Sequence, residues 1–508
     1  MKTKQFTIYS LLLLCTVLGS CKKFLAEYSQ DEIRPTTSTD LAALMYSDAY
    51  PYNMVFDTFD LLTDDMLCNG PAKTAQGTNV ASYETALLSG MAMFKFDPLM
   101  FEASQIIPTG ADVYTAYYNK IKGCNVVMDN LVNVSGSEAD KNAILGQCLV
   151  LRAFYYLKLV TIYGQPYSGV GVNPETSLGV PLVLSSQVKD GGLSRSSLKE
   201  VYDQIEIDLL KATDLLNANF APPTTFRIGA PTANALLSRF YLFRGLNSDW
   251  EKAIDYSTRV LAVKSTLTQL NTFFNGVNFV NQGVYLSSNP EVLWTYGNST
   301  TTSTIAYFPT LSIGYNPPYA VSASLTNLYD RGNGAGTTYE GDLRYKAYFT
   351  IYINGGSFLY RPAKAVPNAT YGGKGFRVAE VYLNRAEAYA KRFVQTGNLA
   401  DGNAALADLN YLRQSRFDTR TVAYRPVAIT NAAELFKFCQ EERRRELCLE
   451  DGDRWVDIKR WGLAVTHSFT GTDGTTTQHV LPAGSPLYAL PIPYTAFLNN
   501  PDLIQNPR

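Results

Sequence analysis

The stretch Leu151-Arg-Ala-Phe-Tyr-Tyr-Leu-Lys-Leu-Val-Thr-Ile-Tyr-Gly-Gln-Pro166 decides how the rest of the chain is organised. Apolar residues recur at helical spacing over residues 140–163, and they cover more than one face of the predicted helix. A helix that is apolar on several faces is buried on several sides. Gly164 and Pro166 follow as stop signals. We therefore expect a long central helix that is surrounded by other helices.

Helical spacing continues on both sides of this segment. It predicts helices over residues 112–134, 231–245, 249–263, 376–391, 401–416 and 432–449. Asn247 and Ser248 mark the turn of one helical hairpin, and the small residues Ala233 and Ala253 allow its two helices to approach closely. Helix–turn–helix pairs of this size resemble tetratricopeptide repeats, although no clean period is visible. The predicted fold class is mainly α, with a tetratricopeptide-like helical-repeat scaffold.

The composition changes between these helices. Residues 266–373 are rich in Thr, Ser, Asn, Gly and Tyr, and they include Pro317-Pro318. This pattern predicts a long loop-rich insert that carries short strands. A second irregular stretch covers residues 69–110. Because binding residues are often carried by loops on a rigid scaffold, we expect function to reside in these two segments.

Charge and composition exclude several classes of function. The 508 residues contain 44 basic and 45 acidic side chains, so the sequence has no electrostatic footprint for nucleic acid. Only two histidines are present, which argues against histidine-clustered metal sites. Aromatic residues make up 12% of the chain, and 34 of them are tyrosines. A ring with a polar tip suits a wet recognition surface.

The N-terminus has the pattern of an export signal. Lys2 and Lys4 precede an apolar run over residues 6–18, which is too short to span a bilayer as a mature helix. Leu18-Gly-Ser-Cys21 resembles the bacterial lipobox, in which cleavage before the cysteine leaves a lipidated thiol. We expect a signal peptide over residues 1–20, a lipid on Cys21 and a tether over residues 21–39. An ordinary secretory signal with a chance cysteine is the alternative.

A search for catalytic motifs finds no phosphate-binding loop, no H-E-x-x-H and no G-x-S-x-G. Asp451, Asp453 and Asp457 lack the spacing of an EF-hand calcium loop. Five cysteines of the predicted mature chain (Cys68, Cys124, Cys148, Cys439 and Cys448) are an odd number, and a disulfide framework is not expected. The sequence predicts no cofactor and no metal. A carboxylate pair for glycoside hydrolysis stays open, because its spacing is spatial rather than sequential.

Several blocks of the sequence resemble the SusD/RagB family, and they follow one another in the same order as in that family. They are residues 151–166, 377–388 and 405–416, then Glu442-Arg443, Arg445-Glu446-Leu447, residues 454–462, Leu490-Pro-Ile-Pro493, Asn500-Pro501 and Gln505-Asn506. Together with the lipobox they cover nearly the whole mature chain. Asp451 departs from the family pattern, in which glutamate usually runs straight into glycine, so the helix end there is left open.

The resemblance implies a lipid-anchored protein of the bacterial outer membrane that faces outside. Such proteins capture glycans, and sometimes peptides, for a SusC-like TonB-dependent transporter, and they are not enzymes. The implied binding domain spans residues 40–508, with a helical core of about 40–65, 111–265 and 376–462. Two rival functions remain: a surface glycoside hydrolase, and a helical-repeat scaffold for protein partners.

The charged residues of the family blocks are expected to pair within the helical scaffold rather than contact ligand, because arginine and carboxylate form bidentate contacts that fix helix register. This set comprises Arg152, Glu387, Arg413, Glu442, Arg443, Glu446, Arg454, Asp457 and Arg460. Trp455 and Trp461 are expected in the core.

Ligand contacts are expected from aromatic residues in the loops, since sugars stack on rings and hydrogen-bond to nearby polar groups. The candidate rings are Phe94, Phe96, Tyr296, Tyr307, Tyr315 and Tyr319. Trp294 lies in a strand-like run and is expected in the core. Asp64 and Asp65 are a candidate polar pair after the first predicted helix, with a cap or turn as the alternative role.

Overall fold

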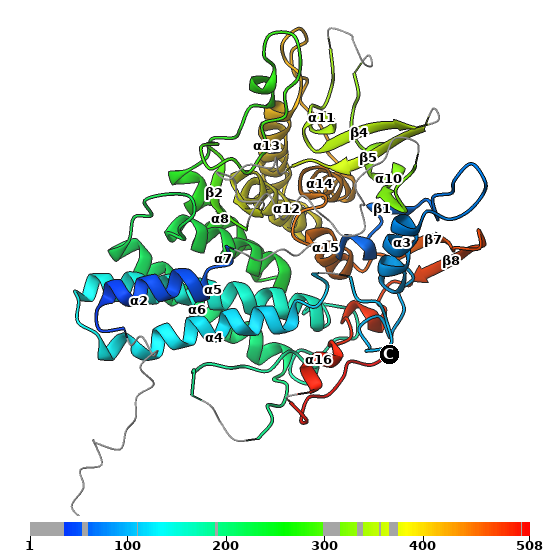
Figure 1. Cartoon of the computed structure of the whole chain (residues 1–508). Coiled ribbons are helices and arrows are strands. Elements are labelled where there is room, and N and C mark those ends of the chain that lie inside the picture. Colours follow the sequence, from blue (N-terminus) through cyan, green and yellow to red (C-terminus); the bar gives the residue numbers. More distant parts are fainter. Residues whose placement is uncertain are drawn as a thin grey trace, which may run out of the picture.

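The computed structural model describes residues 35–508 except 53–58, 109, 188–190, 298–314, 333–338, 355–356, 365–373 and 499. Its framework is a succession of antiparallel helical hairpins (Figure 1). The hairpins are α5 (Glu138–Tyr163) with α6 (Leu198–Asn219), α7 (Ala230–Arg244) with α8 (Asp249–Val263), and α12 (Val378–Thr396) with α13 (Leu399–Arg416). α6 packs on α7, α8 packs on α12, and α14 (Ala432–Leu447) also packs on α12. This order confirms the predicted helical-repeat scaffold.

The central helix α5 begins at a side-chain cap. The Ser137 hydroxyl accepts a hydrogen bond from the backbone N–H of Asp140, and the helix ends before Gly164. Every residue from Gln147 to Tyr163 is buried, which explains why this segment is apolar on more than one face. α5 also has the length and hydropathy of a membrane span, but 94% of its apolar window is buried inside the protein.

Further helices and short turns complete the framework. They are α2 (Ser38–Leu44), the π-helix η1 (Met45–Ala49), α3 (Ala81–Phe94), α4 (Tyr114–Asn130), α10 (Ala323–Thr326), α11 (Arg344–Ala347), α15 (Asp453–Trp461) and α16 (Tyr494–Phe497). The 3-10 turns are η2 (Phe59–Leu62), η3 (Leu131–Asn133), η4 (Leu270–Phe273) and η5 (Pro486–Tyr488). α2 begins inside the predicted tether, because Thr37 and Asp40 form a capping box there.

The strands form four antiparallel pairs. They are β1 (Met66–Cys68) with β3 (Tyr319–Val321), β2 (Val292–Tyr296) with β6 (Lys374–Arg377), β4 (Phe349–Asn354) with β5 (Ser357–Pro362), and β7 (Val465–Thr470) with β8 (Thr476–Leu481). Gly375 has φ +154°, and a Cβ there would lie 1.9 Å from the carbonyl oxygen of Trp294. A side chain would therefore prevent β6 from closing on β2.

The main core lies between the helices, and a smaller one lies under the insert. The smaller core gathers Leu270, Phe273, Tyr285, Leu325, Tyr329, Leu343, Tyr348, Phe349 and Cys448. Cys448 directly follows α14, so the insert is packed onto the scaffold through a helix end. The five cysteines of the predicted mature chain are all free, as expected.

Two helices differ from the sequence expectation. α3 occupies residues that were expected to be irregular, and Gly90 in its middle packs against the ring of Tyr319, where a Cβ would lie 2.6 Å away. The glycine that weakens the local helix signal is required by this close approach. α14 ends at Leu447 rather than Leu449, because Cys448 has an extended ψ of 140° and Leu449, with φ +56°, cannot continue a right-handed helix.

Candidate ligand-binding site

Segments far apart in the chain meet beside β1 and β3. The strand register pairs Met66 with Val321 and Cys68 with Tyr319. Beyond the strands, the Asn69 backbone N–H donates to the carbonyl oxygen of Pro318 at 2.7 Å, and its side chain donates to that of Pro317 at 2.8 Å. The first irregular stretch and the insert are therefore joined at one edge of the protein.

The β7–β8 hairpin closes this edge from the other side. Gly70 packs directly on Thr470, where a Cβ would lie 2.9 Å from the threonine Cβ. The Asn79 side chain donates to the carbonyl oxygen of Thr472 at 3.1 Å. In Figure 1, β1, α3, β7 and β8 gather at one end of the helical framework. We call the surface formed by residues 69–85, 315–318 and 470–475 the loop face.

The loop face carries one half-buried candidate ring among many polar groups. Tyr315 contacts Tyr83 with ring centroids 5.7 Å apart, and its ring is only partly covered. Exposed or half-exposed polar side chains of the loop face are Lys73, Gln76, Thr78, Asn79, Ser82 and Asn316. A ring and hydrogen-bonding groups on one surface suit a sugar, which has a C–H face and a hydroxyl rim.

Three other candidate rings are core residues, which corrects the expectation that they lie at a loop rim. Phe94 and Phe96 are 1% and 6% exposed, and both stack on His467, at 4.0 and 4.7 Å between centroids. Tyr319 is fully buried, and its hydroxyl donates to the carbonyl oxygen of Leu87 at 2.7 Å. The buried imidazole of His467 provides a flat partner that the sequence alone does not place. These rings offer no face to a ligand in this structure.

Tyr296 and Trp294 lie on the buried strand β2. The Tyr296 hydroxyl donates to Asp451 at 2.7 Å, and only 4% of this residue is exposed, so the prediction of Tyr296 as a ligand-contacting loop ring is also wrong. Trp294 is 1% exposed, as the sequence predicts. Tyr307 and Cys21 lie outside the described residues.

Asp64 and Asp65 anchor the loop face to the scaffold. Asp64 accepts two hydrogen bonds from Arg454, each 2.8 Å long, and Asp65 accepts one from Arg444 at 2.7 Å. Burial opposes ionisation of Asp64, but the two guanidinium groups outweigh it and lower its pKa. Burial is the larger effect at Asp65, whose pKa is raised. Both carboxyl groups therefore hold β1 against α14 and α15, and their contacts within the protein leave little capacity for a ligand.

Asp451, at which the sequence departs from the family pattern, also has a structural role. Asp451 has φ +51°, and its carboxylate pairs with Lys158 and Lys374. Burial opposes ionisation, but the two ammonium groups lower the pKa of Asp451 to about 2. This charge cluster holds the turn between α14 and α15 on the central helix α5.

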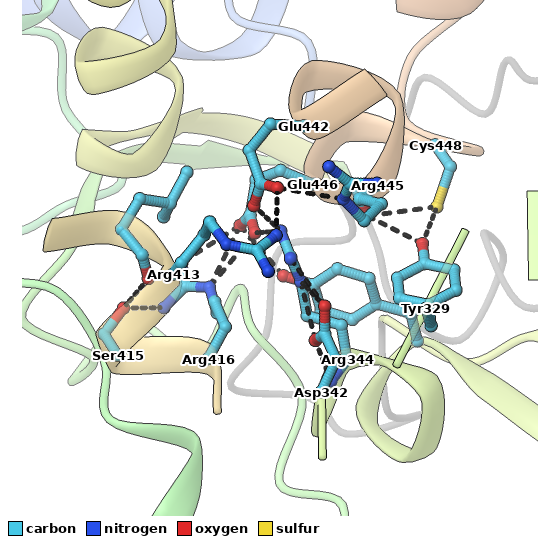
Figure 2. A network of polar contacts seen from close by, with 12 residues as sticks. Tyr329, Asp342, Arg344, Arg413, Ser415, Arg416, Glu442, Arg445, Glu446 and Cys448 are labelled. Atoms are coloured by element: carbon cyan, nitrogen blue, oxygen red, sulfur yellow. Dashed lines mark hydrogen bonds and ion pairs between the residues drawn. The ribbon is translucent and has the colours of Figure 1, made fainter. Parts of the chain in front are cut away.

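A buried ionic network joins the insert to α13 and α14 (Figure 2). Glu446 of α14 is contacted by Arg344 of α11 at 3.2 Å and by Arg416 at the end of α13 at 2.9 Å. Arg377 reaches the same carboxylate at 2.9 Å. Burial alone would raise the pKa of Glu446, but the surrounding arginines hold it well below its usual range.

The expected scaffold pairs are confirmed. Each predicted residue has an ion-pair partner in the structure: Arg152 with Asp208, Glu387 with Arg460, Arg413 and Arg445 with Glu442, Arg443 with Asp457, and Arg454 with Asp64. The arginines that reach Glu446 from the insert side were not singled out from the sequence, because their partners are remote in the chain. Trp455 is buried as expected, whereas Trp461 is only half-buried.

The fold and the candidate site indicate the class to which this protein belongs. Stacked helical hairpins that carry a loop face form a tetratricopeptide-like helical-repeat protein, and within the described segments no three His, Cys, Asp or Glu side chains form a metal-binding group. Residues 80–242 match the SusD-like family described as starch-binding associating with outer membrane, and residues 291–508 match the SusD family. The chain belongs to the SusD/RagB family.

Relatives and solved structures agree with this assignment. The SusD-like protein P2 of Formosa agariphila is 25% identical over 429 residues, which cover 77% of this chain and 78% of that protein. A putative sugar binding protein from Bacteroides vulgatus is 24% identical with a TM-score of 0.66, covering 94% of this chain and 99% of that one. A SusD superfamily protein from Bacteroides thetaiotaomicron is 22% identical with a TM-score of 0.66, covering 93% and 100%. The two structures share the fold of this chain.

Proposed function

We propose that this protein captures an oligosaccharide or polysaccharide at the bacterial cell surface and delivers it intact to a SusC-like TonB-dependent transporter. The match of both halves of the chain to SusD families carries this proposal. One of these families is described as starch-binding, and solved relatives are described as carbohydrate or sugar binding proteins.

The loop face is the surface proposed for capture. It combines the half-buried ring of Tyr315 with exposed polar side chains on the same surface, and it rests on a rigid edge fixed by Asp64, Asp65 and their arginines. Rigid support lowers the entropy that must be lost when a ligand binds. Tyr307 and Cys21 remain part of the proposal on sequence grounds alone.

The ion pairs formed by the candidate carboxylates, Asp64 and Asp65, support binding without cleavage. A glycosidase needs one carboxyl group to donate a proton and a second to act as base or nucleophile. Asp64 is occupied by two guanidinium groups, and Asp65 by one. The guanidinium groups lower the pKa of Asp64, so its ionised form is stabilised and it is a poor proton donor, while the hydrogen bond from Arg444 engages Asp65 within the protein.

The membrane attachment follows from the lipobox-like sequence at Cys21. Two acyl chains on a lipidated cysteine give stable anchoring, whereas one chain binds only marginally. We place the protein in the outer membrane, facing outside, next to its transporter.

Affinity purification from native membranes tests the delivery step. A tag at the C-terminus of the chain, expressed from its own locus and extracted in mild detergent, should recover a large TonB-dependent β-barrel protein in comparable amounts. A matched purification with a tagged, unrelated lipoprotein of the same strain controls for general membrane carry-over. Recovery of the tagged chain alone, under conditions in which other membrane complexes survive, contradicts the proposed partnership.

A further inference from the structure

A cavity of about 120 Å³ lies on the helical framework, away from the segments that form the loop face. It is bounded by the turn after α5, the α7–α8 hairpin, α12 and the end of α15. Its lining includes Phe243, Gly245, Trp250, Lys391, Arg460 and Trp461. Two tryptophans and two cationic side chains line this small cavity. Helix packing alone does not require such a lining.

The Lys391 ammonium faces aromatic rings rather than a carboxylate. Its Nζ lies 4.0 Å from the ring centroid of Phe436 and 5.9 Å from that of Trp250. Over the ranges that the structure describes, Lys391 forms neither an ion pair nor a side-chain hydrogen bond. Burial lowers the pKa of Lys391, and the nearby carboxylate of Glu387 offsets this only in part.

The charges next to Lys391 already neutralise one another. Both oxygens of Glu387 are used by Arg460, and one of them also accepts from the Trp461 indole N–H at 3.0 Å. Asp457 is shared by Arg443 and Arg460. Two arginines therefore balance two carboxylates, and the charge of Lys391 is left over. A partly buried ammonium gains most from an anion that joins it in the same pocket.

The geometry of the walls restricts the shape of that anion. The hydrogen bond to Glu387 fixes the half-buried indole of Trp461, and Trp250 is held in the core with 5% exposed. Gly245 ends α7 with φ +71°, and the nearest atoms to a Cβ there would lie 3.6 Å away. A flat group can lie against the indoles. The cavity is similar in size to the cavity of about 150 Å³ that holds benzene in another protein.

We propose that this pocket binds a carboxylate carried on a small ring or short chain, with Lys391 pairing the carboxylate and Trp461 contacting the group that bears it. Two sources share this chemistry: a uronic acid unit of an acidic saccharide, and the terminal carboxylate of a short peptide. The pocket is formed by other elements than the loop face, so it is a second binding site and does not rest on the proposed function.

Tryptophan fluorescence and calorimetry on the mature protein test the pocket directly, because two of the four tryptophans of the chain line it. The probes are sodium glucuronate, glucose as its uncharged match, and glycylglycine as the peptide carboxylate. Glucuronate or glycylglycine should give a saturable response, and glucose should not. The responding probe identifies the source. Equal responses to glucose and glucuronate, or no response to either carboxylate, overturn the proposal.

Variants separate this site from the loop face. Lys391→Met should weaken carboxylate binding about tenfold or more, because it removes a charged hydrogen-bond partner, while Lys391→Arg should keep most of it. Tyr315→Ala on the loop face should leave the response unchanged. If Lys391→Met folds poorly, the wild-type comparison of glucuronate with glucose and the Lys391→Arg variant still test the proposed pocket. An unchanged response in folded Lys391→Met contradicts the assignment.

Discussion

The ring of Phe94 lies between His467 and Tyr319, with centroid separations of 4.0 and 5.2 Å, and only 1% of the residue is exposed. Phe94→Ala should therefore lower the free energy of unfolding by about 3–5 kcal/mol, the range for a large ring removed from a packed core. The half-buried Tyr315 is the matched control, and Tyr315→Ala should cost about 1 kcal/mol or less. Denaturant unfolding measures both. Similar losses for the two variants would contradict the burial described here.

Asp453 at the start of α15 gives a residue-scale prediction on pH. Burial raises the pKa of Asp453 to about 7, although Arg239 and Lys158 oppose this shift. In the unfolded chain its pKa is about 3.9. Between these values the folded state holds a proton that the unfolded state has released, so this group makes the protein less stable as pH rises from about 4 to 7.

Asp453→Asn removes this titration and isolates its contribution. The unfolding free energy of the variant minus that of the wild type should increase by about 1–3 kcal/mol between pH 4 and pH 7. Thermal or denaturant unfolding at several pH values gives the difference, and other titrating groups cancel in it. A difference that stays constant with pH, or falls, is inconsistent with a protonated Asp453.

At the scale of elements, the arginine–glutamate network decides whether the insert stays attached to the helices. Arg344 is fully buried and contacts Asp342, Glu442 and Glu446. Arg344→Met keeps the apolar stem but leaves buried carboxylates without their cation, and it should destabilise the protein by about 3–5 kcal/mol. The exposed pair of Lys199 and Asp203 on α6 is the control, and Lys199→Met should leave the free energy of unfolding nearly unchanged, because solvent screens this pair. Equal losses in the two variants would show that the network is not a structural joint.

The helices were predictable because their signal is local. Apolar periodicity and stop residues gave α5, α7 and α8 within a few residues of their observed bounds. The pairing of the strands could not be predicted, since the residues that pair in β1 and β3 are about 250 positions apart in the sequence. A pairing at such separation leaves no trace in a local pattern.

The sequence predicts that binding residues lie in two irregular segments, but it does not predict that these segments meet. The structure brings residues 69–80 and 315–318 together at one edge of the protein. The sequence places Phe94 and Tyr319 in stretches that it predicts to be irregular, whereas the stacking of Phe94 on His467 and the packing of Tyr319 on Gly90 arise only in the fold. The partner of a buried ring is a property of tertiary structure.

At the scale of the whole molecule, the proposed function requires a lipid anchor at Cys21. Cys21→Ala removes the thiol that would carry the lipid, so the variant should move from the membrane fraction to a soluble or unprocessed form. Immunoblotting of fractionated cells measures this, and Cys68→Ala serves as a control that should remain with the membrane. A Cys21→Ala protein that fractionates like the wild type rules out the lipoprotein assignment.

The central claim is that the protein binds a saccharide reversibly and leaves it intact, and calorimetry against a glycan panel with product analysis of the same samples tests it most directly. At least one glycan should bind with a dissociation constant between about ten and several hundred micromolar, as a transient capture protein requires. Tyr315→Ala should weaken that binding by about 1–3 kcal/mol, with Tyr315→Phe close to wild type and Tyr411→Ala, an exposed ring on α13, unaffected. The glycan should keep its chain length after long incubation. Shortened products that disappear with a single Asp→Asn or Glu→Gln change, or peptide binding with no response to any glycan, would contradict the account.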